Sequence, residues 1–104
     1  MGDRALAAAL VKKFTARLAP TIQEVERSLA AGDPSRTISI VHNLKGEAGS
    51  MSASHLHRDA ASLEDCLRAG RQDEAGFHLG RLKATAEQCW IERSDALEQL
   101  GDSA

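Results

Sequence analysis

The sequence predicts an all-α protein, an up-down antiparallel four-helix bundle with an additional N-terminal helix. Apolar residues recur at helical spacing along almost the whole chain, whereas the alternation that marks a strand is nearly absent. Aromatic residues make up only 3% of the chain, so the core has to be aliphatic. Because 104 residues can bury one such core but not two, we expect a single domain over 1–104 with its core at about 20–100.

Two helices are predicted before the first glycine-containing turn, at 3–18 and 20–31. Pro20 is expected to separate them, because proline lacks an N–H group and fits only the first turn of a helix. We therefore assign 1–19 to the additional N-terminal helix. Its apolar residues recur every four positions: Leu6, Leu10, Phe14 and Leu18.

A third helix is predicted at 34–51, after the turn Gly32-Asp33-Pro34. Gly32 can end the preceding helix, Asp33 can cap the next one, and Pro34 fits its first position. One face of this helix is apolar and is expected to point into the core. That face consists of Thr37, Ile40, Val41, Leu44, Ala48 and Met51.

The fourth helix is expected to begin near Ser52 or Ser54, either of which can cap it, and to end at Ala69 before Gly70. Its apolar stripe is Leu56, Ala60, Leu63 and Leu67. The last helix is predicted at 72–100. Because all connections are short, consecutive helices should pack antiparallel.

The polar face of the third helix is the most informative feature of the chain. It carries Ser39, His42, Lys45, Gly46 and Gly49, with the histidine near its centre. A glycine inside a helix costs about 1 kcal/mol relative to alanine. Two glycines on the face of one histidine indicate that space is left around the imidazole for a bulky partner.

Several classes of function are excluded by composition and spacing. The net charge of −2 and the pI of about 6.1 give no basic footprint for nucleic acid. No apolar run is long enough for a membrane span or a signal peptide, so a cytoplasmic location is the default expectation. Cys66 and Cys89 lack metal-ligand or redox spacing and are expected to be reduced, while His55, His57 and His78 show no paired spacing for a metal.

The segment His42-Asn43-Leu44-Lys45-Gly46-Glu47-Ala48 resembles the His-x-Leu-Lys-Gly-x-Ala motif of histidine-containing phosphotransfer (HPt) domains of bacterial phosphorelays. The resemblance extends over about residues 2–98. It includes the Gly32-Asp33 turn, Leu56 and the Leu63-Glu64 pair. Two positions depart from the family pattern, because Glu47 replaces a small residue and Ser52 replaces a glycine.

The resemblance implies that the domain accepts and donates a phosphoryl group between receiver-domain aspartates, through phosphohistidine at Nε2 of His42. Lys45 would offset the charge of the phosphoryl oxygens, and Gly46 and Gly49 would leave room for the receiver. The domain would be a carrier without kinase or ATPase activity of its own. The chain also has no Walker-type phosphate loop.

The same resemblance implies no cofactor and no metal in this domain, with Mg²⁺ belonging to the receiver. The expected partners are response-regulator receiver domains. The domain would act either as a stand-alone shuttle or as part of a hybrid sensor kinase anchored in the membrane, with no membrane contact of its own.

Further expectations come from the positions of single residues. Ile38 lies four residues before His42 and, with Ser39, is expected to belong to a docking surface for the receiver. Glu47 lies about 140° from His42 on the wheel and is expected to pair with a base or to face the partner. The pairs Arg58-Asp59 and Glu64-Asp65 are typical of solvated faces, so Glu64 is expected to be structural rather than chemical.

Two alternative functions remain open at this point. The first is the histidine-bearing domain of a chemotaxis-type kinase, which a separate ATP-binding domain phosphorylates. The second is a non-catalytic helical docking module in which His42 never carries phosphate.

Overall fold

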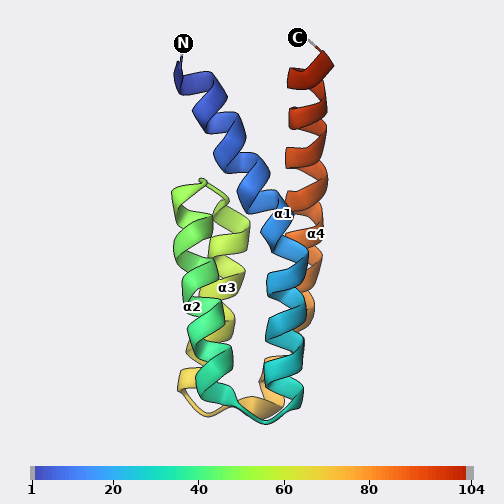
Figure 1. Ribbon diagram of the computed structural model, residues 1–104. Helices are drawn as coiled ribbons and strands as arrows, with labels where there is room; N and C mark the ends of the chain where they lie inside the picture. The colour runs from blue at the N-terminus through green and yellow to red at the C-terminus, as the bar shows by residue number, and fades with distance from the viewer. Residues whose placement is uncertain (1, 103–104) are drawn as a thin grey trace.

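Four helices form the molecule in the computed structural model: α1 (Gly2–Ala30), α2 (Pro34–Ser50), α3 (Ser54–Arg68) and α4 (Gln72–Asp102) (Figure 1). The structure describes the backbone of residues 2–102 and the side chains of residues 6 and 8–93. Each helix packs against its two neighbours in a closed ring, in which α4 returns to α1. The predicted all-α, up-down antiparallel bundle is therefore confirmed.

The separate N-terminal helix predicted at 1–19 was wrong, because α1 continues through Pro20. A proline inside a helix removes one backbone hydrogen bond, and its ring pushes away the carbonyl group four residues earlier. The helix bends at that point but can continue when packing compensates for the loss. In Figure 1 the axis of α1 changes direction within its blue-to-cyan part. Phe14 and Leu18 before the proline and Ile22 and Val25 after it are all buried, which means that packing holds the two halves in one helix.

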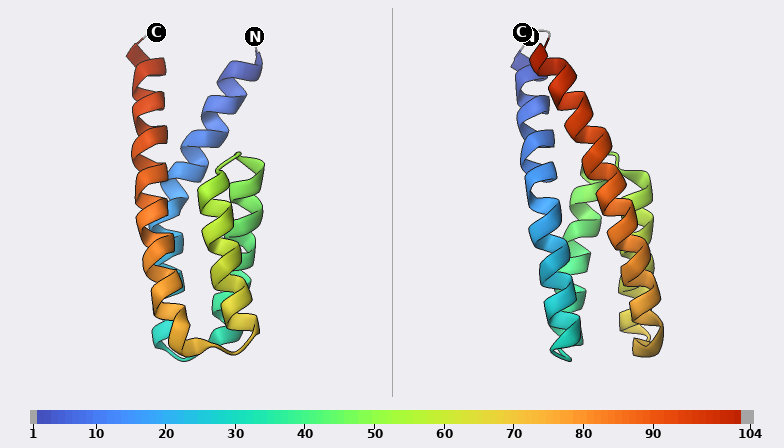
Figure 2. Two further views of the ribbon diagram at one scale, coloured as in Figure 1. Left: turned by 180° about the vertical axis from the view of Figure 1, so that it is seen from behind. Right: turned by 90° about the vertical axis from the view of Figure 1, so that its right-hand side faces the viewer.

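The first and last helices of the chain are much longer than the two between them. α1 and α4 contain 29 and 31 residues, whereas α2 and α3 contain 17 and 15. The N-terminal part of α1 and the C-terminal part of α4 consequently project beyond the turn between α2 and α3 (Figures 1 and 2). Leu6 and Leu10, in the projecting part of α1, are 61% and 45% exposed. Of the apolar stripe predicted for this segment, only Phe14 and Leu18 are therefore buried. No helix has a described stretch long and apolar enough to cross a membrane.

The core is aliphatic, as predicted, and lies where all four helices overlap. Its largest fully buried side chains are Val25, Thr37, Val41, Leu56, Leu63 and Leu82. Buried polar contacts connect neighbouring helices. The hydroxyl groups of Ser28 and Thr37 lie 2.7 Å apart between α1 and α2, and the Thr85 hydroxyl donates to the Asp59 carboxylate between α4 and α3.

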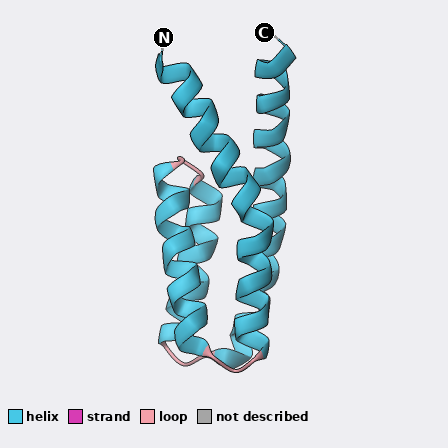
Figure 3. Ribbon diagram, viewed as in Figure 1, coloured by secondary structure: helices cyan, strands magenta, loops and turns pink. Residues whose placement is uncertain are grey.

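Three short turns connect the helices (Figure 3), and all three have the same backbone geometry. The left-handed residue is Gly32 (φ 72°), Ser52 (φ 56°) or Gly70 (φ 75°). In each case the next residue donates its N–H to the carbonyl five positions earlier, which is the Schellman pattern. Ser52 therefore adopts the conformation that glycine favours, at a cost of about 1–2 kcal/mol.

The helix starts follow the predicted chemistry at one turn and not at another. Asp33 caps α2 by accepting a hydrogen bond from the N–H of Arg36 at 3.1 Å, with Pro34 at the first position, as predicted. At α3 the cap residue is Ala53, which supplies no side-chain hydrogen bond. The expected caps at Ser52 and Ser54 were wrong, because the left-handed turn at Ser52 places Ala53 at the cap.

Candidate functional site

His42 lies near the middle of α2, and its side chain is 57% exposed. The two faces predicted for this helix are confirmed, although Ile40 and Met51 of the predicted apolar face are only partly buried against the core. Thr37, Val41, Leu44 and Ala48 are buried, whereas Ser39, His42, Gly46 and Gly49 are exposed. The core-facing residues thus fix α2 so that the imidazole points out of the bundle.

Glu64 contacts the imidazole from the neighbouring helix, α3. Its Oε2 atom lies 3.1 Å from Nδ1 of His42, and its Oε1 atom lies 2.7 Å from Nζ of Lys45. The Nε and Nη2 atoms of Arg68 both lie 2.8 Å from Oε2. One buried carboxylate therefore contacts three basic side chains: His42, Lys45 and Arg68.

The expectation that Glu64 and Asp59 lie on solvated faces was wrong, since they are only 3% and 4% exposed. A signal for this was present in the sequence. Glu64 follows Leu63 and lies four residues after Ala60, which places it inside the apolar stripe of α3. A charged residue on a buried face needs a partner, and α2 supplies it. Arg68 was not singled out by sequence reasoning at all.

The charge of Glu64 determines which nitrogen of His42 holds the proton. Burial alone would raise the pKa of Glu64, but its contacts with Lys45, Arg68 and His42 outweigh burial and lower that pKa to about 2. The group is therefore an ionised carboxylate at neutral pH, which only accepts hydrogen bonds. Nδ1 of a neutral His42 has to be the donor, so Nε2 carries the free lone pair.

Lys45 lies on the same side of α2 as His42, one turn later, as predicted. Its side chain is 28% exposed and its ammonium is paired with Glu64. The lysine therefore lies beside the imidazole ring instead of extending freely into solvent. A cation held in this way is positioned for an anionic group that approaches the ring.

Comparison with known families agrees with this geometry. A family model described as "Hpt domain" matches residues 9–102, nearly the whole chain. The chain belongs to the Hpt domain family. Domains of this family take part in histidine phosphotransfer in phosphorelays and interact with receiver domains of response regulators. No curated protein and no solved structure matched the chain.

The two glycines of this Hpt domain have different surroundings. A methyl group at Gly46 would meet no heavy atom within 4 Å, so the surface there is open. At Gly49 a methyl group would lie 3.3 Å from Nδ1 of His57. That nitrogen donates a hydrogen bond to the Lys45 carbonyl at 2.9 Å. Gly49 thus accommodates a side chain of α3 as well as lying on the exposed face.

Ile38 is less exposed than its place on the helical wheel predicts. It is partly buried and packs against the core of the Hpt domain. Ser39, its neighbour, is exposed. Only part of the isoleucine surface is therefore available to a partner.

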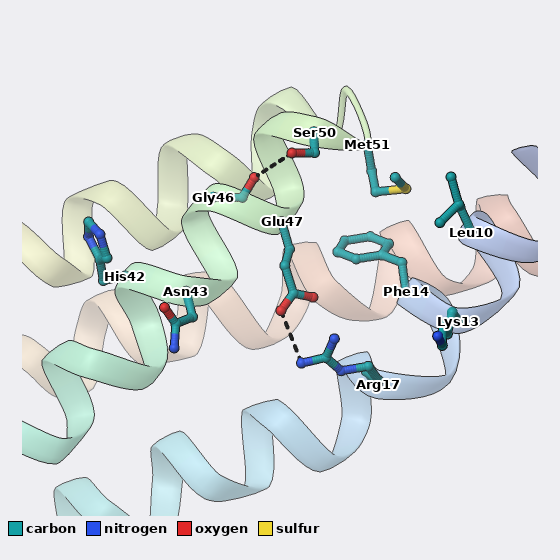
Figure 4. Close-up of a pocket in the computed structure, with 10 residues that line it drawn as sticks. All are labelled: Leu10, Lys13, Phe14, Arg17, His42, Asn43, Gly46, Glu47, Ser50 and Met51. Carbon is teal, nitrogen blue, oxygen red and sulfur yellow. Dashed lines mark hydrogen bonds and ion pairs between the residues drawn. The ribbon is translucent and has the colours of Figure 1, made fainter.

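A groove of about 610 Å³ runs from His42 along the upper part of α1. Figure 4 shows Glu47 and Arg17 facing each other across it, with 3.0 Å between Oε1 and Nη2. The expectation that Glu47 pairs with a base is confirmed. The remaining side chains that line the groove include Leu10, Lys13, Phe14, Asn43 and Met51.

Both cysteines are free, as predicted, and both are buried. Cys66, Glu74 and His78 place donor atoms within 4.8 Å of one another, a grouping that the sequence spacing does not reveal. The Cys66 thiol donates a hydrogen bond to the Arg71 carbonyl, and burial together with the charge of Glu74 raises the pKa of this thiol. At neutral pH the thiol is therefore protonated and serves as the donor of this hydrogen bond.

Proposed function

We propose that this Hpt domain accepts a phosphoryl group from the aspartyl phosphate of one receiver domain and donates it to an aspartate of another, with His42 as the carrier. The observation that supports this most directly is the contact between Nδ1 of His42 and the buried carboxylate of Glu64. It leaves an unprotonated, solvent-facing Nε2 as the nucleophile.

The proposed step is an in-line displacement at phosphorus. The Nε2 lone pair forms the N–P bond while the P–O bond to the donor aspartate breaks, and the aspartate leaves as a carboxylate. The imidazole ring gains positive charge and keeps its proton on Nδ1. Glu64 stabilises that charge, in the way that a carboxylate stabilises an imidazolium in a catalytic triad. Transfer to the next aspartate reverses the same changes.

Lys45 and the surface around the ring have supporting roles in this proposal. The ammonium of Lys45 offsets the negative charge of the phosphoryl oxygens. Ile38, Ser39, Gly46 and Gly49 form the surface on which the receiver docks. The receiver supplies Mg²⁺, and this domain supplies no cofactor. We place the domain in the cytoplasm with its response regulators, either alone or within a hybrid sensor kinase.

The test is transfer of radiolabelled phosphate from a phosphorylated receiver to the isolated chain. The wild-type domain should acquire label that is stable to base and labile to acid, as expected of phosphohistidine. His42→Gln should acquire none. His55→Gln, which changes an exposed histidine of α3, should be labelled like the wild type.

Two results would contradict the proposal. Labelling by an ATP-bound kinase domain but by no receiver would favour the histidine-bearing domain of a chemotaxis-type kinase. Absence of label from both sources would favour a docking module in which His42 stays unmodified.

A further inference from the structure

Arg68 shares one oxygen atom with the phosphoacceptor histidine. Its Nε and Nη2 atoms lie 2.8 Å from Oε2 of Glu64, the atom that also accepts from Nδ1 of His42 at 3.1 Å. Arg68 is on α3, one turn after Glu64, and its side chain is 56% exposed. The polar contacts found for its guanidinium are those with Glu64, so we consider an effect on the ring that acts through this carboxylate.

The charges around Glu64 indicate what that effect is. A carboxylate next to a histidine favours the imidazolium, which has no lone pair on Nε2. Here Lys45 and Arg68 contact the same carboxylate, so the three groups already carry a net charge of +1 before His42 takes up a second ring proton. A further positive charge on the ring is then disfavoured.

The other charged groups near His42 do not reverse this balance. On the α1 side, Arg17 and Glu47 form an ion pair with each other and cancel. Lys13 lines the same groove and adds positive charge, which acts in the same direction as Arg68.

We propose that Arg68 is a positioning residue that keeps His42 neutral and protonated only on Nδ1 by taking up part of the charge of Glu64. The effect of Arg68 on the rate of phosphotransfer rests on the proposed function, because only the neutral ring can attack phosphorus. The protonation of His42 itself can be measured without any phosphotransfer.

The experiment follows the ring nitrogens of His42 by NMR across a pH titration at low salt. In Arg68→Gln the pH at which His42 gains its second proton should rise by about half a unit or more relative to the wild type, because one nearby positive charge is lost. Arg68→Lys should return it toward the wild-type position. Added salt should shrink the difference, since Arg68 is half exposed.

Arg71→Gln is the matched control. It removes one positive charge from the same end of α3, but its guanidinium pairs with Glu74 and not with Glu64. His42 should titrate in this variant as in the wild type. Identical titration in Arg68→Gln and the wild type, or an equal rise in Arg71→Gln, would overturn the proposal.

A second measurement separates this inference from the proposed function. If the wild type is labelled by a receiver, the rising limb of the rate-against-pH profile should move to higher pH in Arg68→Gln and return in Arg68→Lys. If no receiver labels the wild type, the proposed function fails, while the NMR titration still decides the role of Arg68.

Discussion

Oε2 of Glu64 lies 3.1 Å from Nδ1 of His42, although 22 residues separate the two in the chain. This contact joins α3 to α2 at the Nδ1 side of the imidazole, opposite the solvent-facing Nε2. It converts a surface histidine into one with a fixed tautomer.

Glu64→Gln should slow phosphotransfer without unfolding the domain. The amide keeps the shape of the side chain but loses the charge that fixes the proton on Nδ1. We expect the rate constant for transfer from a receiver to fall by about tenfold to a hundredfold, by analogy with the loss of activity when the hydrogen-bond partner of a metal-binding histidine is changed. Rapid-quench measurement of label transfer gives the rate. A rate equal to that of the wild type would show that the carboxylate is not needed.

Stability should depend on pH through Glu64. A carboxyl group whose pKa is lower in the folded than in the unfolded state stabilises the fold above its unfolded value, and this contribution is lost as pH falls through its folded value. For Glu64 the two pKa values are 4.5 and about 2. The difference corresponds to up to about 3 kcal/mol at neutral pH, which should disappear between about pH 4.5 and pH 2.

Urea unfolding of the wild type and of Glu64→Gln at several pH values measures this contribution. The gap between the two unfolding free energies should be largest at pH 7 and should close on acidification. A gap that does not change between pH 7 and pH 2 would contradict the assignment.

Ser52→Gly should stabilise the domain. Ser52 has φ of 56°, which strains a residue with a side chain but not a glycine. Relief of about 1–2 kcal/mol of strain is partly offset by the greater freedom of glycine in the unfolded chain, so we expect a gain of about 0.5–1 kcal/mol. Ser50→Gly, inside the last turn of α2, should instead lower stability by about 0.5 kcal/mol. Equal effects at the two positions would rule out the strain argument.

Arg93→Met should weaken the turn between α2 and α3. The Nη2 atom of Arg93 donates to the carbonyl of Met51 at 3.0 Å, which joins α4 to the C-terminal end of α2. A cation at this end of a helix also interacts favourably with its dipole. Loss of both should lower the unfolding free energy by about 1–2 kcal/mol, measured by chemical denaturation. The Ser52→Gly gain should be unaltered in that background if the two effects are independent.

The parts of the fold that local chemistry controls could be predicted from the sequence. Asp33 and Pro34 marked the start of α2, and periodicity placed His42 and Lys45 on the exposed face of that helix. Pro20 misled the prediction because tertiary packing on both sides of it outweighs one lost hydrogen bond. The helix propensities of single residues do not include such tertiary contacts.

The candidate site could be predicted only in its α2 half. His42, Lys45 and Gly46 lie within one segment, so their mutual placement follows from helical geometry. Glu64 and Arg68 join them only when α3 packs antiparallel to α2 in one particular register. The sign of this contact in the sequence is a charged residue, Glu64, within the apolar stripe of α3.

The most direct test of the central claim is the location of the phosphoryl group on the labelled protein. NMR of the domain with ¹⁵N-labelled histidine, phosphorylated by a receiver, distinguishes the two ring nitrogens and the four histidines. We predict a single N–P bond at Nε2 of His42, with the proton retained on Nδ1. Phosphate on Nδ1, or on His55, His57 or His78, would contradict the account.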